Sequence, residues 1–328
     1  MNNSIENHEL ANTFNRLTPD LVLNSLESVG FLTTGRVITL NSYENRVYQI
    51  ELEDGRWVVG KFYRPGRWSK LSILEEHDFL KELDEQEIPV ALPLQLEDGS
   101  TLGNMDGIMF ALFPRIGGRL LEEPSEEKLM QVGRLIARIH NVGATRKASH
   151  RIDLNPDSYG YNNLEYLINN NVIPSEAREN YKQTALMLLQ RIVPMFNEVP
   201  VIRIHGDCHA GNLIESQAGA TFLDFDDMVN APAVQDVWML APSFDEYGQR
   251  EREALLTGYV EFRDFNPAWL RLIEPLRALR FIHYSTWIAK RIKDPAFIKT
   301  FEYFGTVQYW QKETMDLREQ IARIDSLI

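Results

Sequence analysis

The chain has 328 residues, of which 44% are hydrophobic and 25% charged, and it carries a formal net charge of −13 at pH 7. This length is enough for two substantial cores, and the acidic balance disfavours nucleic acids and anionic membrane surfaces as partners. The single cysteine, Cys208, excludes an internal disulfide framework, and no stretch has the pattern of a signal peptide or a transmembrane helix, so we expect a cytoplasmic monomer.

The N-terminal part of the sequence predicts a helix followed by an antiparallel meander. Thr18-Pro19-Asp20 is typical of a helix start, and Gly30 ends the apolar pattern that follows it. Runs of β-branched and aromatic residues then predict three strands, over Val37–Leu40, Val47–Leu52 and Trp57–Val59. Apolar residues at helical spacing predict a second helix over Ser69–Gln86.

A change in pattern near residue 114 divides the chain. The apolar strand Ile108–Phe113 runs into Pro114 and the pair Gly117-Gly118, which is typical of a hinge. We therefore predict two parts, residues 1–114 and residues 115–328. The second part predicts helices from Ser125 onward, over Leu164–Leu167, Ala177–Val193, Arg252–Phe262, Pro267–Lys293 and Thr306–Leu327, and a loop over Ile152–Tyr161. The expected fold class is α+β, with a small antiparallel sheet and a larger, mainly helical part.

The segment from Val201 to Asp227 contains most of the polar residues that indicate chemistry. A short buried strand over 201–204 leads into His205, Asp207, His209 and Asn212 on a loop with two glycines. A second strand over 221–223 ends at Asp224, with Asp226 and Asp227 directly after it. Carboxylates that crowd at neighbouring strand ends need a cation between them, or one of them must become neutral.

Three interpretations of this segment are possible. In the first, Asp207 is a general base for a substrate hydroxyl, while Asn212 and Asp224 hold a hard cation that binds a polyphosphate. In the second, His205, Asp207 and His209 ligate the transition metal of a hydrolase. In the third, the segment is an acidic turn with a structural histidine. Asn212 together with the strand that ends in Asp224 favours phosphoryl transfer.

The motif H-G-D-C-H-A-G-N over residues 205–212, followed by F-L-D-F-D over 222–226, resembles the catalytic and metal-binding loops of the aminoglycoside phosphotransferase/choline kinase superfamily. With the motifs N-S-Y-E-N-R-V-Y from residue 41, K-F-Y-R-P from residue 61 and P-A-V-Q-D-V-W-M-L from residue 232, the chain resembles the stress response kinases, which are bacterial serine/threonine protein kinases. These motifs extend over nearly the whole chain. The resemblance implies a bilobal protein-kinase-like fold, a nucleotide-binding lobe over 1–114, a catalytic and substrate lobe over 115–328, and ATP and Mg²⁺ as co-substrate and cofactor.

Lys61 is the predicted contact to the nucleotide phosphates. A lysine at the end of a buried strand needs an acidic partner, because an unpaired buried charge is costly. Glu75 and Glu76 on the following helix are the candidates, and Glu76 is preferred because it shares a face with apolar residues of that helix. A solvated lysine and two surface glutamates are the alternative.

Three more residues complete the predicted nucleotide site. The loop over 41–45 has no glycine, so Ser42 is our choice for a phosphate contact, although an ordinary hairpin loop fits the sequence equally well. The strand end from Ala111 to Pro114, with Ala111 and Phe113 as the chosen residues, is predicted to present backbone groups to the adenine ring. By the resemblance, Asn212 and Asp224 are metal ligands, Asp207 and Asp224 are catalytic, and Asp226 is an auxiliary carboxylate.

Several other polar residues are expected to be structural. Asp236 is interpreted as the N-terminal cap of an apolar helix, and in related kinase folds an aspartate here also braces the catalytic loop. His140 is expected to be a hydrogen-bonded packing residue, and Cys208 a small buried filler. Four cations lie along one predicted helix, and either a contact with substrate or a solvated charged face fits them, of which the solvated face is favoured: Arg277, Arg280, Lys290 and Arg291.

The resemblance implies transfer of phosphate to serine and threonine hydroxyls in proteins, with autophosphorylation, in a bacterial stress response. The interval from Asp224 to Asp236 is short for the peptide-docking segment of protein kinases, so the residues alone favour a small hydroxylated metabolite as acceptor. A catalytically silent kinase-like binding module is a further alternative. Lys61, Asp207, Asn212 and Asp224 together argue against it, because a silent fold has no need of all four.

Overall fold

A five-stranded antiparallel sheet forms the N-terminal part of the protein in the computed structural model, which describes residue 14 and residues 17–216 and 219–326. The strand order is β1-β2-β3-β5-β4. The strands are β1 (Thr33–Leu40), β2 (Arg46–Leu52), β3 (Trp57–Phe62), β4 (Gly103–Met105) and β5 (Ile108–Pro114). The polar segment over residues 1–10, which bears on the prediction of a cytoplasmic protein, lies outside the described residues.

The chain divides into two compact units that we call unit 1 and unit 2. Unit 1 comprises Met1–Glu123, Ser149–Arg151 and His209–Asp227, and unit 2 comprises Pro124–Ala148, Ile152–Cys208 and Met228–Ile328. The predicted division after residue 114 differs from these units, because unit 1 also contains the segments Ser149–Arg151 and His209–Asp227 from later in the chain. The predicted division stays a prediction. The predicted α+β class is confirmed, because unit 1 carries the antiparallel sheet and unit 2 is mainly helical.

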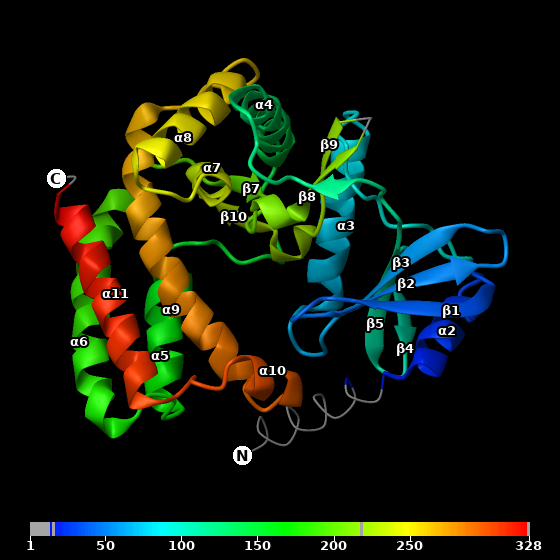
Figure 1. The fold of residues 1–328 in the computed structure, drawn as a ribbon, viewed down its shortest axis with the longest axis horizontal. Helices are drawn as coiled ribbons and strands as arrows, with labels where there is room; N and C mark the ends of the chain where they lie inside the picture. The colour runs from blue at the N-terminus through cyan, green and yellow to red at the C-terminus, as the bar shows by residue number, and fades with distance from the viewer. Residues whose placement is uncertain (1–13, 15–16, 217–218, 327–328) are drawn as a thin grey trace. The chain divides into compact units, whose positions relative to one another are not determined.

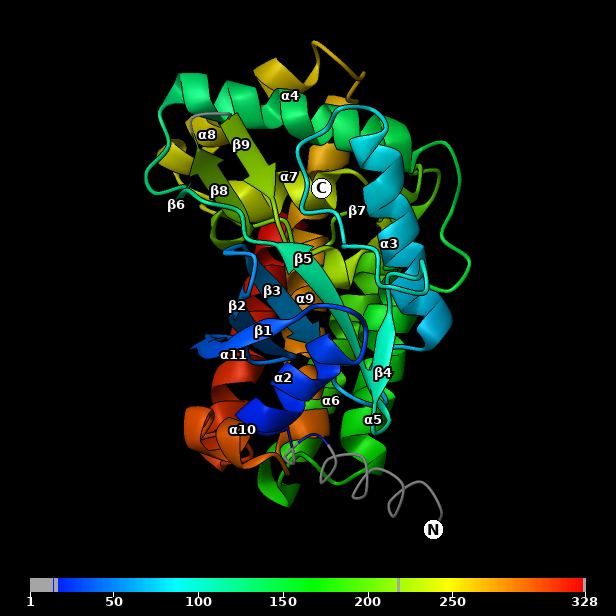
Figure 2. The same ribbon diagram turned by 90° about the vertical axis from the view of Figure 1, so that its right-hand side faces the viewer.

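Two helices pack in unit 1 with the five-stranded sheet. Helix α2 (Pro19–Glu27) begins where the Thr18 hydroxyl accepts a hydrogen bond from the Leu21 backbone, and it contacts β1 and β4 (Figures 1 and 2). Helix α3 (Lys70–Asp84) begins with Ser69, whose hydroxyl accepts from the Ser72 backbone. The inward face of α3 contains buried apolar residues and two buried glutamates, Glu75 and Glu76. Acidic side chains therefore lie in the interior of unit 1.

Unit 1 also contains a three-stranded sheet, of which the sequence predicts one strand. It has the order β6-β8-β9, with β6 (Arg119–Leu120), β8 (Leu213–Ser216) and β9 (Gly219–Phe222). The sequence predicts β9 but not β8, because β8 is short and its pairing with β6 joins segments far apart in the chain. The β8–β9 hairpin matters for the site, since Asn212 precedes β8 and Asp224 follows β9.

Unit 2 is built from helices and one small two-stranded sheet. The helices are α4 (Glu126–Gly143), α5 (Asn162–Asn169), α6 (Ser175–Ile192), α7 (Val234–Leu240), α8 (Glu246–Tyr259), α9 (Ile273–Arg291), α10 (Pro295–Thr300) and α11 (Val307–Asp325). The strands β7 (Ile202–Ile204) and β10 (Val229–Ala231) pair antiparallel. Helices α5, α6, α9 and α11 surround one apolar core, while α4 and α8 pack side by side (Figure 1).

The contact between α4 and α8 depends on two glycines. A Cβ atom at Gly133 would lie 1.9 Å from the carbonyl oxygen of Leu255, and one at Gly258 would lie 1.9 Å from that of Met130. These distances are far below a van der Waals contact, so the two helix backbones touch only because neither residue has a side chain.

The expected loop over Ile152–Tyr161 contains a turn of π-helix, Pro156–Tyr161. It forms because the Asn155 side chain accepts hydrogen bonds from the backbones of Asp157 and Ser158, which is a local capping pattern. No helix within the described ranges is long and apolar enough to span a membrane.

Candidate functional site

Unit 1 contains a pocket of about 340 Å³ that gathers most of the residues predicted for the nucleotide site. Its lining comes from the β1–β2 loop, from β2 and β3, from α3, from the segment after β5 and from the β8–β9 hairpin. Among the lining residues are Ser42, Lys61, Glu76, Phe113, Asn212 and Asp224. Ala111 is fully buried in β5 opposite Lys61 and is not among the lining residues, and the predicted contact of its backbone with the adenine ring stays a prediction.

Lys61 lies among three carboxylates. Its Nζ is 2.7 Å from Asp224 Oδ1, 3.4 Å from Asp226 Oδ1 and 3.8 Å from Glu76 Oε1. Burial lowers the pKa of Lys61, but Asp224, then Asp226 and Glu76, raise it well above its ordinary value. Lys61 is therefore a protonated, buried cation, and the acidic residue of α3 beside it is Glu76 rather than Glu75.

Glu75 and Glu76 have different partners although they are neighbours on α3. The Glu75 carboxylate accepts hydrogen bonds from the backbones of Ser149 and His150, and it joins that segment to α3. Glu76 Oε2 accepts from Arg151 Nη2 at 3.1 Å. Burial raises the pKa of Glu76 to about 7, against the lowering effect of Lys61 and Arg151.

Asp226 is a buried counter-ion rather than a carboxylate at the pocket surface. It is 2% exposed and forms an ion pair with Arg67 and accepts from Asn45 Nδ2 at 3.1 Å. Burial raises its pKa, but Arg67, Lys61 and Arg151 together hold that pKa well below its ordinary value. Asp224, by contrast, has a half-exposed side chain that lines the pocket.

Sequence reasoning missed Arg67 and Arg151. Arg67 pairs with Asp226 and Asp227, and Arg151 donates to the backbone oxygens of Ser72 and Asp226. Both belong to segments with no motif of their own. The sequence contained one signal for these arginines. Several carboxylates were predicted near Lys61, and one lysine cannot balance the charge of several buried carboxylates, so further cations are required.

The glycine-free loop between β1 and β2 is held in place by its neighbours. Arg64 Nε donates to the Glu44 carbonyl oxygen at 3.0 Å, and the Arg64 backbone donates to Asn45 Oδ1 at 3.2 Å. Asn45 in turn donates to Asp226. These bonds replace glycine as the means of shaping the loop, and they leave Ser42 among the residues that line the pocket.

Asn212 and Asp224 stand at the same end of the β8–β9 hairpin. Leu213 pairs with Phe222, and the Leu223 backbone donates to the Asn212 carbonyl oxygen at 2.9 Å. Both residues line the pocket, and their side chains offer an amide oxygen and a carboxylate. Oxygen donors of this kind suit a hard divalent cation such as Mg²⁺, so the residues present fit the predicted cofactor.

Asp207 belongs to unit 2, at the end of β7. Its Oδ1 accepts a hydrogen bond from Arg280 Nη2 of α9 at 3.0 Å. The sequence analysis favoured a solvated charged face for Arg280. The structure differs, because Arg280 forms an ion pair with Asp207, the residue assigned as the base.

The loop that carries Asp207 is held by Asp236, which is not the helix cap that we predicted. Asp236 is the third residue of α7, and its carboxylate accepts from the backbones of His205 and Gly206, each at 2.9 Å. The prediction for His140 is confirmed, since it is fully buried and bonds to Asp236 and to the Tyr259 hydroxyl. Asp236 thus braces the catalytic loop, as the likeness to related kinase folds led us to expect, and the simpler interpretation as a cap of α7 was wrong.

The two histidines of the motif both accept hydrogen bonds from backbone N–H groups. His205 Nδ1 accepts from the Asp207 backbone at 3.4 Å, and His209 Nδ1 accepts from the Gly211 backbone at 3.0 Å. In the part of the chain that the structure describes, no three His, Cys, Asp or Glu side chains are grouped to hold a metal ion. Cys208 is buried as expected, and burial raises the pKa of its thiol well above the usual value.

The sequence matches the phosphotransferase enzyme family over residues 36–273. The chain belongs to this family. It is 39% identical over 321 residues to stress response kinase A of Escherichia coli (strain K12), with 98% of this chain and 95% of that protein covered. It is 38% identical over 309 residues to the serine/threonine protein kinase RdoA of Salmonella typhimurium, with 94% of each covered. The resemblance to the stress response kinases is thereby confirmed.

Solved structures of other phosphotransferases share the fold. The amicoumacin kinase hAmiN, in complex with AMP-PNP, Ca²⁺ and Ami, has a TM-score of 0.72 at 20% identity, covering 88% of this chain and 94% of that one. A microcompartment-associated aminopropanol kinase has a TM-score of 0.67 at 17% identity, with coverage of 93% and 97%. At such identities the likeness establishes the fold of this phosphotransferase and not its acceptor.

Proposed function

We propose that the chain is an ATP- and Mg²⁺-dependent kinase that phosphorylates serine and threonine hydroxyls in proteins, itself included, in a bacterial stress response. The observation that carries the proposal is the pocket of unit 1, which brings Lys61, Glu76, Asn212 and Asp224 together. The name of the Salmonella typhimurium relative, a serine/threonine protein kinase, supports the protein acceptor, and the name of the Escherichia coli relative supports the stress response.

Lys61 binds the phosphates of the nucleotide in this proposal. Its charge is kept by the carboxylates around it, and Glu76 fixes the direction of its side chain. Asn212 and Asp224 would hold Mg²⁺, which when bound neutralises the charge of the phosphates. The adenine ring is read by the backbone from Phe113 onward, since residues 113–116 line the pocket.

Asp207 receives or orients the acceptor hydroxyl. Its backbone segment is fixed by Asp236, and its side chain is fixed by Arg280, so the carboxylate has a defined position before an acceptor binds. Such preorganisation is the main contribution that a protein makes to phosphoryl transfer. The carboxylate is 24% exposed and therefore accessible to an acceptor.

The nature of the acceptor is decided by incubation with γ-labelled ATP and Mg²⁺. One reaction contains the protein alone, one a mixture of serine and threonine peptides, and one a set of hydroxylated metabolites. Label on the protein or the peptides supports the proposal. Label on metabolites alone would replace it with a small-molecule kinase, the class to which the hAmiN and aminopropanol kinases belong by name. If labelled phosphate is transferred in none of the three reactions, the chain is a catalytically silent binding module.

A further inference from the structure

Arg280 is the charged residue of α9 that reaches the acceptor side of the proposed reaction. Its Nη2 donates to Asp207 Oδ1 at 3.0 Å, and its side chain is 40% exposed. Within the described part of the chain, this is the one partner of its guanidinium group. Four further N–H groups of Arg280 are therefore available to a ligand while the bond to Asp207 persists.

The other arginine on this part of α9 is already engaged. Arg277 forms an ion pair with Glu274, donates to the Pro242 carbonyl oxygen and stacks over the ring of Trp238 at 4.8 Å. Arg277 is thus a structural residue. Of the two, Arg280 is the one whose remaining donors are available for binding.

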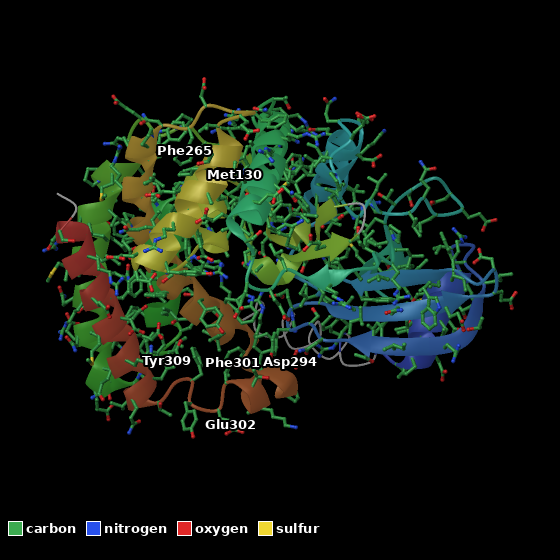
Figure 3. All side chains as sticks on the ribbon, turned by 45° about the horizontal axis from the view of Figure 1, so that its top comes forward. Met130, Phe265, Asp294, Phe301, Glu302 and Tyr309 are labelled. Atoms are coloured by element: carbon green, nitrogen blue, oxygen red, sulfur yellow. The ribbon has the colours of Figure 1, made fainter. Side chains whose placement is uncertain are left out.

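An aromatic surface begins one turn beyond Arg280. Tyr284 follows Arg280 by four residues, which places both on one side of α9, and Tyr284 is 44% exposed. Its ring stacks on that of Trp287, with 5.5 Å between the ring centroids. The centroid of the Phe301 ring, which is labelled at the α10 end in Figure 3, lies 6.2 Å from that of Tyr284. An aromatic surface beside a cation suits an extended peptide better than a small metabolite.

We infer that Arg280 is a positioning and specificity residue that selects serine and threonine acceptors with a carboxylate close to the hydroxyl in the peptide. One N–H of Arg280 keeps Asp207 in place, and the outer edge of the same guanidinium binds an acidic side chain of the peptide. This inference rests on the proposed function, because it takes Asp207 as the group that receives the acceptor hydroxyl.

The geometry limits where the acidic residue lies in the peptide. Asp207 Oδ1 and Arg280 Nη2 are 3.0 Å apart, so the hydroxyl on Asp207 and the carboxylate on Arg280 must be close neighbours in the peptide. An extended chain advances about 3.3 Å per residue and turns alternate side chains to the same face, so an acidic residue two positions from the serine is best placed to reach Arg280. Arginine suits this double contact because its planar fork binds two carboxylates at once, whereas a lysine is a single point charge.

The test compares two serine peptides that differ only in glutamate or glutamine at the positions one and two residues from the serine. Fluorescence anisotropy gives their affinities for the wild-type protein, for Arg280→Gln and for Arg280→Lys. The wild type should bind the glutamate peptide about tenfold more tightly than the glutamine peptide. Arg280→Gln should abolish this preference, and Arg280→Lys should restore part of it.

Steady-state phosphorylation of the same peptides separates binding from positioning. Arg280→Gln should raise KM about tenfold for the glutamate peptide only, and should lower kcat for both because Asp207 loses its fixed position. The affinity for ATP should not change. Arg134→Gln is the matched control, since Arg134 is 35% exposed, pairs with Glu261 in the same unit and does not contact Asp207.

Equal affinity of the wild type for both peptides would overturn the inference. So would an unchanged preference in Arg280→Gln, or the same loss in Arg134→Gln. Binding preference that depends on Arg280 without any phosphate transfer would refute the proposed function but leave the peptide specificity standing.

Discussion

Single carboxylates with the same chemistry have different roles in this protein because their surroundings differ. Asp224 is half-exposed and lines the pocket, whereas Asp226 is buried and neutralises Arg67 and Lys61. Asp207 is held by Arg280 in unit 2. The roles that we propose for these residues lead to two predictions at this scale.

Asp207→Ala should remove phosphoryl transfer but leave nucleotide binding intact. Asp207 lies outside the unit that contains the pocket, and loss of a general base typically lowers kcat by about 10²–10⁴-fold. The measurements are single-turnover transfer from labelled ATP and calorimetric titration with ATP and Mg²⁺. Turnover like that of the wild type would show that Asp207 is not the base.

Asp226→Asn should destabilise the protein by about 3–5 kcal/mol, because it removes the one buried carboxylate that Arg67 and Lys61 share and leaves each cation with weaker compensation. The measurement is the urea midpoint of unfolding. Asp54→Asn is the matched control, since its ion pair with Arg56 is exposed and its midpoint should stay unchanged. Equal shifts in both variants would contradict the assignment of Asp226 as a buried counter-ion.

At the scale of elements, the helices and strands of this chain are placed by contacts that their own sequences do not reveal. Strand β8 exists because it pairs with β6 and β9, and α4 and α8 meet through glycines on both helices. Helix propensity alone treats each of these glycines as a defect.

Gly258→Ala should lower stability although alanine favours a helix. The added Cβ would lie 1.9 Å from the Met130 carbonyl oxygen, and overpacking of this kind costs about 1–3 kcal/mol. The measurement is thermal unfolding followed by circular dichroism.

Thr257→Ala provides the control, because Thr257 is the exposed neighbour on the same helix and should tolerate the change. If Gly258→Ala is as stable as the wild type, the two helices do not need this close approach in solution.

At the scale of the whole molecule, the formal charge of −13 counts every glutamate as ionised, although burial raises the pKa of Glu76 and of Glu313 to about 7. Glu313 lies on α11. Burial raises its pKa to about 7, while the Ser285 hydroxyl, which donates to Glu313 Oε2 at 3.1 Å, lowers it.

A raised carboxyl pKa means that the folded protein binds a proton more tightly than the unfolded chain. The contribution of Glu313 to stability is therefore fully present below about pH 4.5 and is lost as the pH rises toward 7. Glu313→Gln should remove this dependence, so that its stability relative to the wild type increases by roughly 2–3 kcal/mol between pH 5 and pH 8. Urea unfolding at several pH values measures the difference, and parallel curves for the two proteins would disprove it.

Much of the molecule follows from the sequence by itself. The period of the apolar residues determines the meander of unit 1 and the helices of unit 2, since side chains repeat with the geometry of each element. The H-G-D and D-F-D motifs indicate the family, and the inward face of α3 selects Glu76 over Glu75.

Tertiary structure decided what the individual charges do. Arg67, Arg151 and Arg280 have no local signal, because the partner of each arginine comes from a distant segment of the chain. Asp236 resembles a helix cap in its local sequence, and only the likeness to related kinase folds indicated that it holds the loop of Asp207. Hydrophobic periodicity is a local property and can be read along the chain, whereas the pairing of buried charges depends on which segments meet in space.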